Sequence, residues 1–221
     1  MRRIKGAVFL SLDGVMQAPG GPSEDPTGGF AHGGWVAGVF DEGIGRTLGA
    51  LFTPPYALLL GRRTYDIFAA HWPHATGDDA AMGEAFTAAD KYVLSHGEVA
   101  TGWANTHRLG GIADVAALKG TEGPDLVIQG SSTLYPALLA AGLLDEVTTM
   151  TFPIVLGAGK RLFGDGTPAG ALKVTDSYVT DAGTVVATYE PAGPLTIGNF
   201  AIAEQSAEEQ ARQRRMAEGS W

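Results

Sequence analysis

The stretch "LLLGRRTYDIF", residues 58–68, decides the fold of this chain. An apolar run ends at Gly61, and Arg62 and Arg63 then open a segment with helical spacing. A strand that passes through glycine directly into a helix is the repeating unit of an α/β domain. The first turn of a helix carries partial positive charge, so two arginines there are unfavourable unless an anion lies close by.

The residues around Gly61 suit a phosphate group. Glycine lets a ligand approach the backbone closely, and the free N–H groups at the start of the helix attract an anion. The guanidinium groups of Arg62 and Arg63 match phosphate geometry, and Thr64 can cap the helix or donate its hydroxyl to an oxygen. The alternative is a pair of exposed arginines that reach back to acidic neighbours such as Asp66.

Two further segments place polar residues after a strand. In "VIQGSSTLYPALL", residues 127–139, the strand is followed by Gly130, Ser131, Ser132 and Thr133. Two such helix starts in one domain favour a ligand with more than one phosphate, although plain helix capping would explain this segment alone. In "YVLSHG", residues 92–97, a strand ends at Ser95 and His96, which could receive another phosphate oxygen.

Composition narrows the class of protein. The 221 residues are 45% hydrophobic and 18% charged, which is ordinary for a globular core. A net charge of -9 argues against a general nucleic-acid partner, which would need a basic face. The chain has no cysteine, so thiolate nucleophiles and cysteine-ligated zinc are excluded, and its histidines fit no standard zinc spacing. No segment is long and apolar enough to span a bilayer, so we expect no membrane association and a cytoplasmic location.

Predicted strands and helices alternate along most of the chain. The last two predicted strands, Leu172–Val179 and Thr184–Glu190, form a hairpin across "TDAG". The pattern predicts an α/β domain with a mainly parallel central sheet, an antiparallel C-terminal hairpin and helices on both faces. Apolar spacing predicts helices over Val36–Leu51 and Ser132–Ala141.

The ends of the domain are marked by composition. We place the domain at residues 1–192 and a polar C-terminal extension, partly helical in pattern, at residues 193–221. The pair Glu208–Arg212 is its best-spaced helical ion pair. The extension is either a solvated tail or a functional arm.

A long loop follows the first predicted strand, Ile4–Ser11. The window from Leu12 to Gly34 holds seven glycines and three prolines. Long loops inside compact domains are often lids or binding loops, and its position directly after a core strand favours that interpretation. The alternative is a floppy surface excursion.

Taken together, five segments carry a family resemblance: "SLDGVMQAPGG", "GRRTYDIFAAHWP", "KYVLS", "VIQGSSTLYPALLAAGLLDEV" and "PIVLGAGKRLF". In order and spacing, the chain from about Ile4 to Glu190 resembles the dihydrofolate-reductase-like reductases. It is most similar to the reductase domain of the riboflavin-biosynthesis deaminase-reductase family. The resemblance implies a single dihydrofolate-reductase-like domain, NADPH as cofactor and a homodimer.

The resemblance also implies roles for particular residues. Arg62 would meet the 2′-phosphate of NADPH, with Ser95 and His96 beside it, and Thr64 the pyrophosphate. The candidate cofactor-binding residues are Gly61, Arg62, Arg63, Thr64, Ser95, His96, Gln129, Gly130, Ser131, Ser132 and Leu134, of which Arg63 has no fixed role in the family. Dihydrofolate reductases have a cis Gly-Gly pair at the second turn, whereas Gln129–Gly130 stands here, so a cis bond is not assured.

Aromatic residues and two acids are candidates for the substrate side. Trp35, Tyr65 and Trp72 flank the loop and the first cofactor turn and suit a flat heterocycle, and Met16 lies in the loop itself. Core packing is the alternative for these residues, and for Tyr65 it is the favoured one. Asp13 at the loop hinge is the first candidate for a catalytic acid, and Asp41 on the following helix is the second. As alternatives, Asp13 would simply form a turn with the following glycine, and Asp41 would be a solvated charge on the helix face.

These observations lead to two hypotheses. The first is an NADPH-dependent reductase that transfers hydride to a C=N or C=O carbon of a pterin-like or aminopyrimidine-ribosyl heterocycle. The second is a non-catalytic nucleotide-binding sensor or scaffold that uses the C-terminal extension to contact a protein partner.

Overall fold

The strands build one mixed sheet. The computed structural model describes residues 1–164, 166–200 and 204–220, and over these residues eight strands pair in the order β4-β3-β2-β5-β1-β6-β8-β7. They are β1 (Ile4–Ser11), β2 (Tyr56–Gly61), β3 (Lys91–Leu94), β4 (Thr106–Leu109), β5 (Asp125–Gln129), β6 (Glu146–Phe152), β7 (Leu172–Val179) and β8 (Val185–Pro191). Strands β1 to β6 run parallel, and β8 and β7 are antiparallel to their neighbours. The predicted mainly parallel sheet with an antiparallel hairpin is confirmed.

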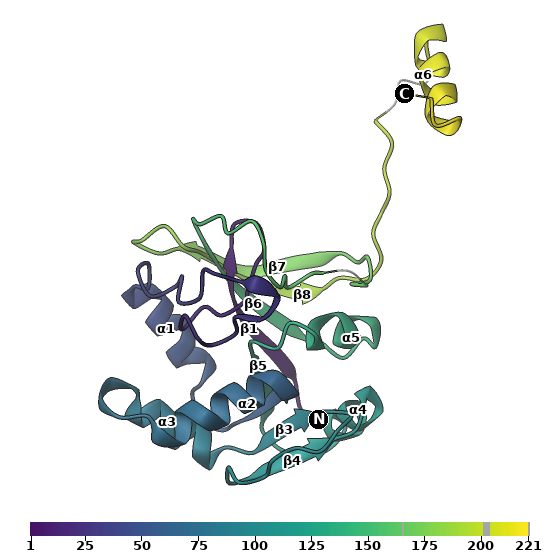
Figure 1. Ribbon diagram of the computed structural model, residues 1–221. Helices are drawn as coiled ribbons and strands as arrows, with labels where there is room; N and C mark the ends of the chain where they lie inside the picture. Colours follow the sequence, from purple (N-terminus) through teal and green to yellow (C-terminus); the bar gives the residue numbers. More distant parts are fainter. Residues whose placement is uncertain (165, 201–203, 221) are drawn as a thin grey trace.

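Helices cover both faces of the sheet (Figure 1). They are α1 (Glu42–Leu51), α2 (Arg62–His71), α3 (Ala80–Ala88), α4 (Ile112–Lys119), α5 (Leu134–Ala140) and α6 (Ala207–Ala217). On one face, Ile44 of α1 packs with Met150 and Phe152, and Tyr65 of α2 packs with the strand β2. On the other face, Tyr135 of α5 packs against β1 and β5. The apolar residues of β1, β2 and β5 are therefore buried from both sides.

Two predicted helices begin later than their apolar patterns indicate. The helix predicted from Val36 begins at Glu42, because Asp41 caps it by accepting a hydrogen bond from the Ile44 N–H at 3.0 Å. Val36 is nevertheless buried, because it lies in a turn that packs against the core. The helix predicted from Ser132 begins at Leu134, because residues 131–134 form a turn in which the Leu134 N–H donates to the Ser131 carbonyl oxygen at 2.9 Å.

The chain beyond β8 carries one more helix. Helix α6 is capped by Ser206, and none of its described residues is buried. The predicted pair Glu208–Arg212 is wrong: the Arg212 guanidinium contacts both carboxylate oxygens of Glu209, at 2.7 and 2.6 Å. Pairing at i,i+3 gives this guanidinium two parallel hydrogen bonds. No helix in the described part of the chain is long and apolar enough to cross a membrane.

Candidate functional site

A groove lies at the carboxyl ends of the parallel strands, between the starts of three helices. It has a volume of about 670 Å³ and is formed by the carboxyl ends of β2 and β3 and by the starts of α2, α4 and α5. In open α/β sheets, ligands bind at this edge. The predicted cofactor residues that line it are Gly61, Arg62, Arg63, Ser95, His96 and Leu134. Segments far apart in sequence thus contribute to one site.

Two strand-to-helix turns at this edge, which we call corners, are linked by hydrogen bonds. The first corner joins β2 to α2, and the second joins β5 to α5. The Gly61 N–H donates to the Ser131 hydroxyl oxygen at 2.9 Å, and the Ser131 N–H donates to the Thr64 hydroxyl oxygen at 3.1 Å. Gly130, with a φ of 72°, turns the chain so that Ser131 faces α2. The polar groups of Thr64 and Ser131 therefore fix the spacing of the corners. Across the described residues the only cis peptide bond joins Pro54 and Pro55, so Gln129–Gly130 is trans.

The two arginines of the first corner lie on the groove in different surroundings. The Arg62 Nε donates to both carboxylate oxygens of Asp66 at 2.9 Å, and the Arg62 Nη1 contacts the Glu98 carbonyl oxygen. Arg63 is 60% exposed, with its Nη1 4.0 Å from the Asp25 carboxylate. The Asp66 pairing expected as the alternative is thus present, yet an exposed ion pair of this kind is weak. Arg62 remains able to change partner.

The loop after β3 is held by an arginine that the sequence did not reveal. The Ser95 hydroxyl donates to the Gly97 carbonyl oxygen at 3.0 Å. From β4, the Arg108 Nε donates to the same oxygen at 2.8 Å, and the Arg108 Nη2 donates to the His96 carbonyl oxygen at 3.1 Å. The signal available was that "THRL" forms a parallel strand ending at the same edge as β3. Arg108 therefore adds positive charge beside His96.

The aromatic residues expected to contact substrate do not line this groove. Tyr65 is 1% exposed, and its hydroxyl contacts the Ala100 carbonyl oxygen, so packing explains it. Trp72 packs edge-on against Phe86 with ring centroids 5.0 Å apart. Met16 is buried in the core cluster on the α5 side of the sheet.

Trp35 belongs to the loop that follows β1. Its Nε1 donates to the Gln17 carbonyl oxygen at 2.9 Å, and its ring packs edge-on against Phe152. The residue therefore anchors the loop to the sheet. Its position between the loop and the end of β6 keeps it at the carboxyl edge where the sheet strands end.

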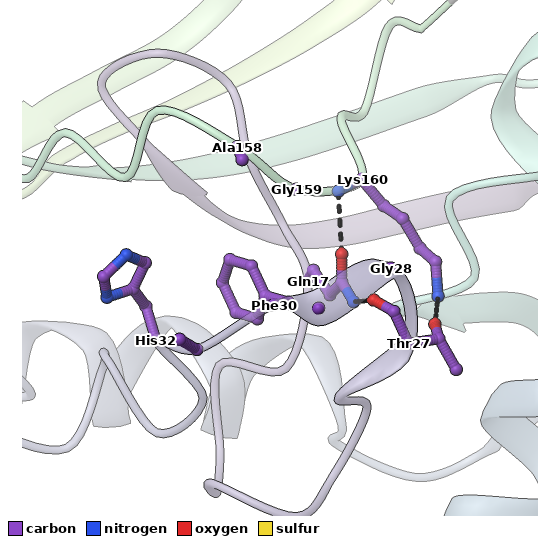
Figure 2. A pocket seen from close by; sticks show the side chains of 10 residues that line it. Gln17, Thr27, Gly28, Phe30, His32, Ala158, Gly159 and Lys160 are labelled. Atoms are coloured by element: carbon purple, nitrogen blue, oxygen red, sulfur yellow. Dashed lines mark hydrogen bonds between the residues drawn. The ribbon is translucent and has the colours of Figure 1, made fainter.

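The loop itself is pinned in place, and the interpretation as a floppy excursion is wrong. Figure 2 shows a smaller cavity of about 330 Å³ between this loop and the segment 158–160. The Gln17 Nε2 donates to the carbonyl oxygens of Asp25 and Thr27, each at 2.9 Å, and its Oε1 accepts from the Lys160 N–H at 3.0 Å. The Lys160 ammonium contacts the Asp25 carboxylate and donates to the Thr27 hydroxyl oxygen at 2.7 Å.

Asp13, the first candidate for a catalytic acid, has a structural task. Its carboxylate accepts hydrogen bonds from the Leu156 N–H at 3.0 Å, the Gly157 N–H at 2.8 Å and the Ser11 hydroxyl at 2.7 Å. The Leu156 hydrogen bond first, and then that of Ser11, hold the pKa of Asp13 well below its ordinary value. An acid so strongly ionised is a poor proton donor.

Asp41, the second candidate, is likewise committed to structure. Besides capping α1, its carboxylate accepts from the Ala182 N–H at 2.9 Å. Hydrogen bonds, that of the Thr180 side chain first, lower its pKa. Asp41 therefore ties α1 to the turn between β7 and β8, away from the groove.

One buried polar atom at this edge has no partner among the described residues. The Oε1 of Gln129, the last residue of β5, is buried without a hydrogen bond. Its neighbour Ile128 faces the α5 side, so Gln129 faces the side of α1 and α2. Such an acceptor is costly unless a donor reaches it. Within the described ranges no group of three His, Cys, Asp or Glu residues could hold a metal ion.

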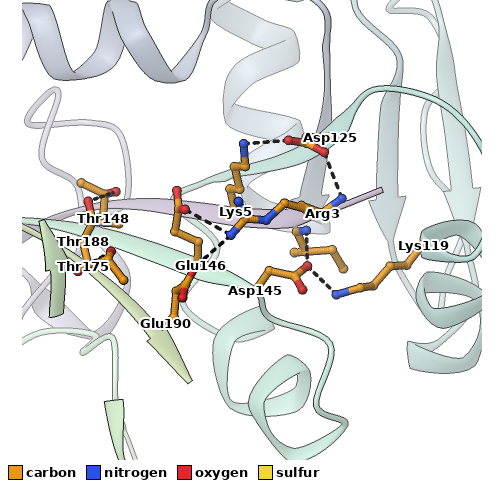
Figure 3. A network of polar contacts seen from close by, with 11 residues as sticks. Arg3, Lys5, Lys119, Asp125, Asp145, Glu146, Thr148, Thr175, Thr188 and Glu190 are labelled. Carbon is orange, nitrogen blue, oxygen red and sulfur yellow. Dashed lines mark hydrogen bonds and ion pairs between the residues drawn. The ribbon is translucent and has the colours of Figure 1, made fainter. Parts of the chain in front are cut away.

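The amino ends of the parallel strands, opposite the groove, carry a separate set of charges (Figure 3). Arg3 contacts Glu146 at 3.3 Å and Glu190 at 3.1 Å, and the Lys5 ammonium lies 2.7 Å from the Asp125 carboxylate. These pairs tie β1 to the ends of β5, β6 and β8. The structural ion pairs and the groove thus lie at opposite ends of the strands.

The architecture is that of the dihydrofolate-reductase-like class of α/β domains, with its groove at the carboxyl edge of the sheet. Within that class, the chain belongs to the family of the RibD C-terminal domain, whose model matches residues 3–186. The family resemblance read from the sequence is confirmed.

Individual relatives agree with this assignment. The chain is 25% identical over 194 residues to the uncharacterized protein YyaP of Bacillus subtilis (strain 168), covering 85% of this chain and 94% of that one. A crystal structure assigned to riboflavin biosynthesis from Shewanella sp. PV-4 matches with a TM-score of 0.60 at 22% identity, covering 86% of this chain and 99% of that one. Dihydrofolate reductase of Enterococcus faecalis, complexed with NADP(H) and RAB-propyl, matches with a TM-score of 0.53 at 14% identity, covering 86% and 96%.

Proposed function

We propose that the protein is an NADPH-dependent reductase that transfers hydride to a C=N or C=O carbon of a pterin-like or aminopyrimidine-ribosyl heterocycle. The observation that carries the proposal is the groove in which Arg62 and Arg63 meet Ser95 and His96 at the carboxyl edge of the sheet. Membership of the RibD C-terminal domain family supports it. The proposal includes a cytoplasmic location, supported by the absence of cysteine, and no nucleic-acid partner, supported by the net charge of -9. It also includes a homodimer, which is the expectation from the family resemblance.

The donor set of the groove fits a dinucleotide with an extra phosphate. Arg62 and Arg63 would hold the 2′-phosphate, with Ser95 and His96 beside it, and the first N–H groups of α2 would hold the pyrophosphate. The unpartnered Oε1 of Gln129 would accept a hydrogen bond from an amide or amino group. NADPH, when bound, would supply the hydride.

The remaining residues orient the site and exclude water. The crosswise hydrogen bonds of Thr64 and Ser131 preform the two corners. The pinned loop after β1, with Trp35, covers the same edge of the sheet. Asp13 and Asp41 hold loops in place, so we assign the proton to water and not to either carboxyl.

The Arg62→Ala variant tests the proposal. NADPH binding, measured by fluorescence titration, is expected to weaken about 10- to 100-fold, because charge-assisted hydrogen bonds to the 2′-phosphate are lost. NADH binding should change little. Arg46→Ala is the matched control, since Arg46 forms a similar exposed pair with Glu42 on α1. Equal affinity of the wild type for both cofactors, unchanged by Arg62→Ala, would rule the assignment out.

A second candidate function is a nucleotide-binding sensor. It is favoured by the structural use of both candidate acids and by the exposed helix α6. A panel of pterins, aminopyrimidine ribosides and simple carbonyl compounds, assayed by NADPH oxidation, separates the two. Turnover of any acceptor supports the reductase, and tight NADPH binding without turnover supports the sensor.

A further inference from the structure

The C-terminal hairpin, formed by β7 and β8, has exposed apolar side chains on one face, which we call the bare β7–β8 face. Every residue of β7 is exposed. Four apolar side chains of the hairpin are exposed: Leu172 at 37%, Val174 at 51%, Val179 at 63% and Val185 at 45%. An exposed apolar surface of this kind, on a strand that ends a sheet, marks a contact surface.

A β-bulge gathers these side chains on one face. The register of β7 shifts between Val174 and Asp176, so Val174 lies opposite Tyr189 and Val179 lies opposite Val185. Side chains alternate along β8, so Tyr189 and Val185 point the same way, and Val174 and Val179 therefore do too. Without the bulge they would point to opposite faces.

The bulge is supported by a side chain, and the other face of the hairpin is already used. The Thr175 hydroxyl donates to the Thr188 carbonyl oxygen at 3.2 Å (Figure 3). On the opposite face, the Tyr178 hydroxyl donates to the Gly43 carbonyl oxygen of α1 at 3.2 Å. One face of the hairpin thus packs on α1. On the other face Ala187 is buried and Tyr189 packs against the core, whereas Leu172, Val174, Val179 and Val185 are exposed.

The backbone of β7 is available as well. Within the described residues β7 is the last strand of the sheet and pairs with β8 alone. An unpaired edge presents a row of N–H and C=O groups that can pair with an extended segment.

The same chain carries an extended apolar segment without a surface to cover it. After Pro191 the backbone leaves the sheet as an extended segment outside any strand (Figure 1). Leu195, Ile197 and Phe200 are exposed at 51%, 85% and 106%. Hydrogen bonds from Ala192 to Ala171 and from Ala171 to Gly193, both 2.8 Å, fix the origin of this segment at the end of the hairpin. From there the segment leads away from the sheet (Figure 1).

We propose that residues 194–200 of one copy of this chain pack on the bare β7–β8 face of a second copy, with a reciprocal contact returned by the partner. Both surfaces are extended and present exposed apolar side chains, namely Leu195, Ile197 and Phe200 on the segment and Leu172, Val174, Val179 and Val185 on the hairpin. A reciprocal exchange closes on itself as a two-fold dimer and leaves neither surface exposed. The contact goes beyond the expectation of a homodimer, because it names the segment and the surface that join.

Cross-linking of the full-length chain tests the contact directly, because the native sequence has no cysteine. A Val174→Cys chain is mixed with a separately tagged Ile197→Cys chain and oxidised. We expect a disulfide between positions 174 and 197 of different chains, identified by mass spectrometry. A mixture of the Val155→Cys and Ile197→Cys chains is the control, since Val155 is 69% exposed but lies outside the hairpin. Equal cross-linking in both mixtures, or a bond within one chain only, overturns the proposal.

Sedimentation velocity of full-length variants gives an independent result. The wild type should be a dimer, and Ile197→Asp/Phe200→Asp and Val174→Asp should each raise the dimer dissociation constant at least about tenfold, because a charge is buried in the contact. Val155→Asp should not, and circular dichroism checks that all variants fold. A wild type that stays monomeric at about 100 μM, far above the Kd of an ordinary homodimer, overturns the proposal. So does a dimer that both sets of variants leave intact.

Discussion

At the scale of single residues, the Arg62 guanidinium pairs with Asp66 at the same position where we propose that it binds a phosphate. Its guanidinium contacts Asp66 and the Glu98 carbonyl oxygen, although it stands at a helix start where a cation is unfavourable. Asp66 also lines the groove, so a phosphate at Arg62 would meet a carboxylate close by. The acid should therefore temper the affinity for a 2′-phosphate.

Replacing Asp66 by Asn tests this competition. The Asp66→Asn variant should bind NADPH about three- to tenfold more tightly than the wild type, because a repelling and competing charge is removed from an exposed site. NADH affinity should move less. Glu42→Gln, which disrupts a similar pair with Arg46 on α1, is the control and should leave both affinities unchanged. Weaker NADPH binding by Asp66→Asn would show that the acid positions Arg62 instead.

The carboxyl group of Asp13 makes the stability of the fold depend on pH. Its folded-state pKa lies below the ordinary 3.8, so its contribution to stability is complete above that pH and is lost as the pH falls. In Asp13→Asn the melting temperature should be lower at pH 7 and should fall less steeply from about pH 5 to pH 3. Thermal melts across that range check this. Parallel wild-type and variant curves would contradict it.

Tyr135 carries a buried hydroxyl that nothing in the described chain satisfies. The side chain is fully buried, and burial raises the pKa of its hydroxyl. Tyr135→Phe should therefore raise the free energy of unfolding by about 1 kcal/mol, since an unpaired polar group is removed. Tyr65→Phe is the contrasting variant and should lower it, because the Tyr65 hydroxyl contacts the Ala100 carbonyl oxygen. Urea unfolding of both measures the difference.

At the scale of elements, the starts of α2 and α5 act as one unit. Ser131 accepts from Gly61 and donates to Thr64, so it contacts the first corner twice. Ser131→Ala and Thr64→Val should each cost about 1 kcal/mol of stability. Their effects should not add, because they share the Ser131–Thr64 hydrogen bond. A double-mutant cycle by urea unfolding measures the coupling, and strict additivity would argue that the corners are independent.

The same scale shows what the sequence could predict. The bounds of β1 and β7 agree with the predicted Ile4–Ser11 and Leu172–Val179, since short apolar or alternating runs between turn residues leave little freedom. The start of α1 was misplaced, because Val36 is buried by tertiary packing and not by a helix. Periodicity cannot separate those two causes.

The candidate site was predictable only in part. Arg62 and Ser95 lie on one groove as the motifs suggested, because the carboxyl ends of parallel strands share an edge. The tasks of Asp13 and Asp41 depend on N–H groups of Leu156 and Ala182, far along the chain. Such long-range hydrogen bonds leave no local pattern.

At the scale of the whole molecule, a ligand in the groove links β2, β3 and their helices. NADPH at about 100 times its Kd should raise the free energy of unfolding by about 2.7 kcal/mol, since it binds the folded chain alone. The melting temperature measured with and without NADPH shows this gain. In Arg62→Ala the gain should shrink at the same NADPH concentration. A wild type whose melting temperature ignores NADPH would contradict cofactor binding itself.

The position of β1 in the sheet also governs how the protein is made. This strand is synthesised before the other described strands, but its neighbours on either side are β5 and β6, at residues 125–152. Until that distant part has been synthesised, the apolar Ile4–Ser11 has no permanent partner in the nascent chain. The folding of the newly synthesised protein therefore includes an interval in which β1, one of the two middle strands of the sheet, lacks both of its partner strands.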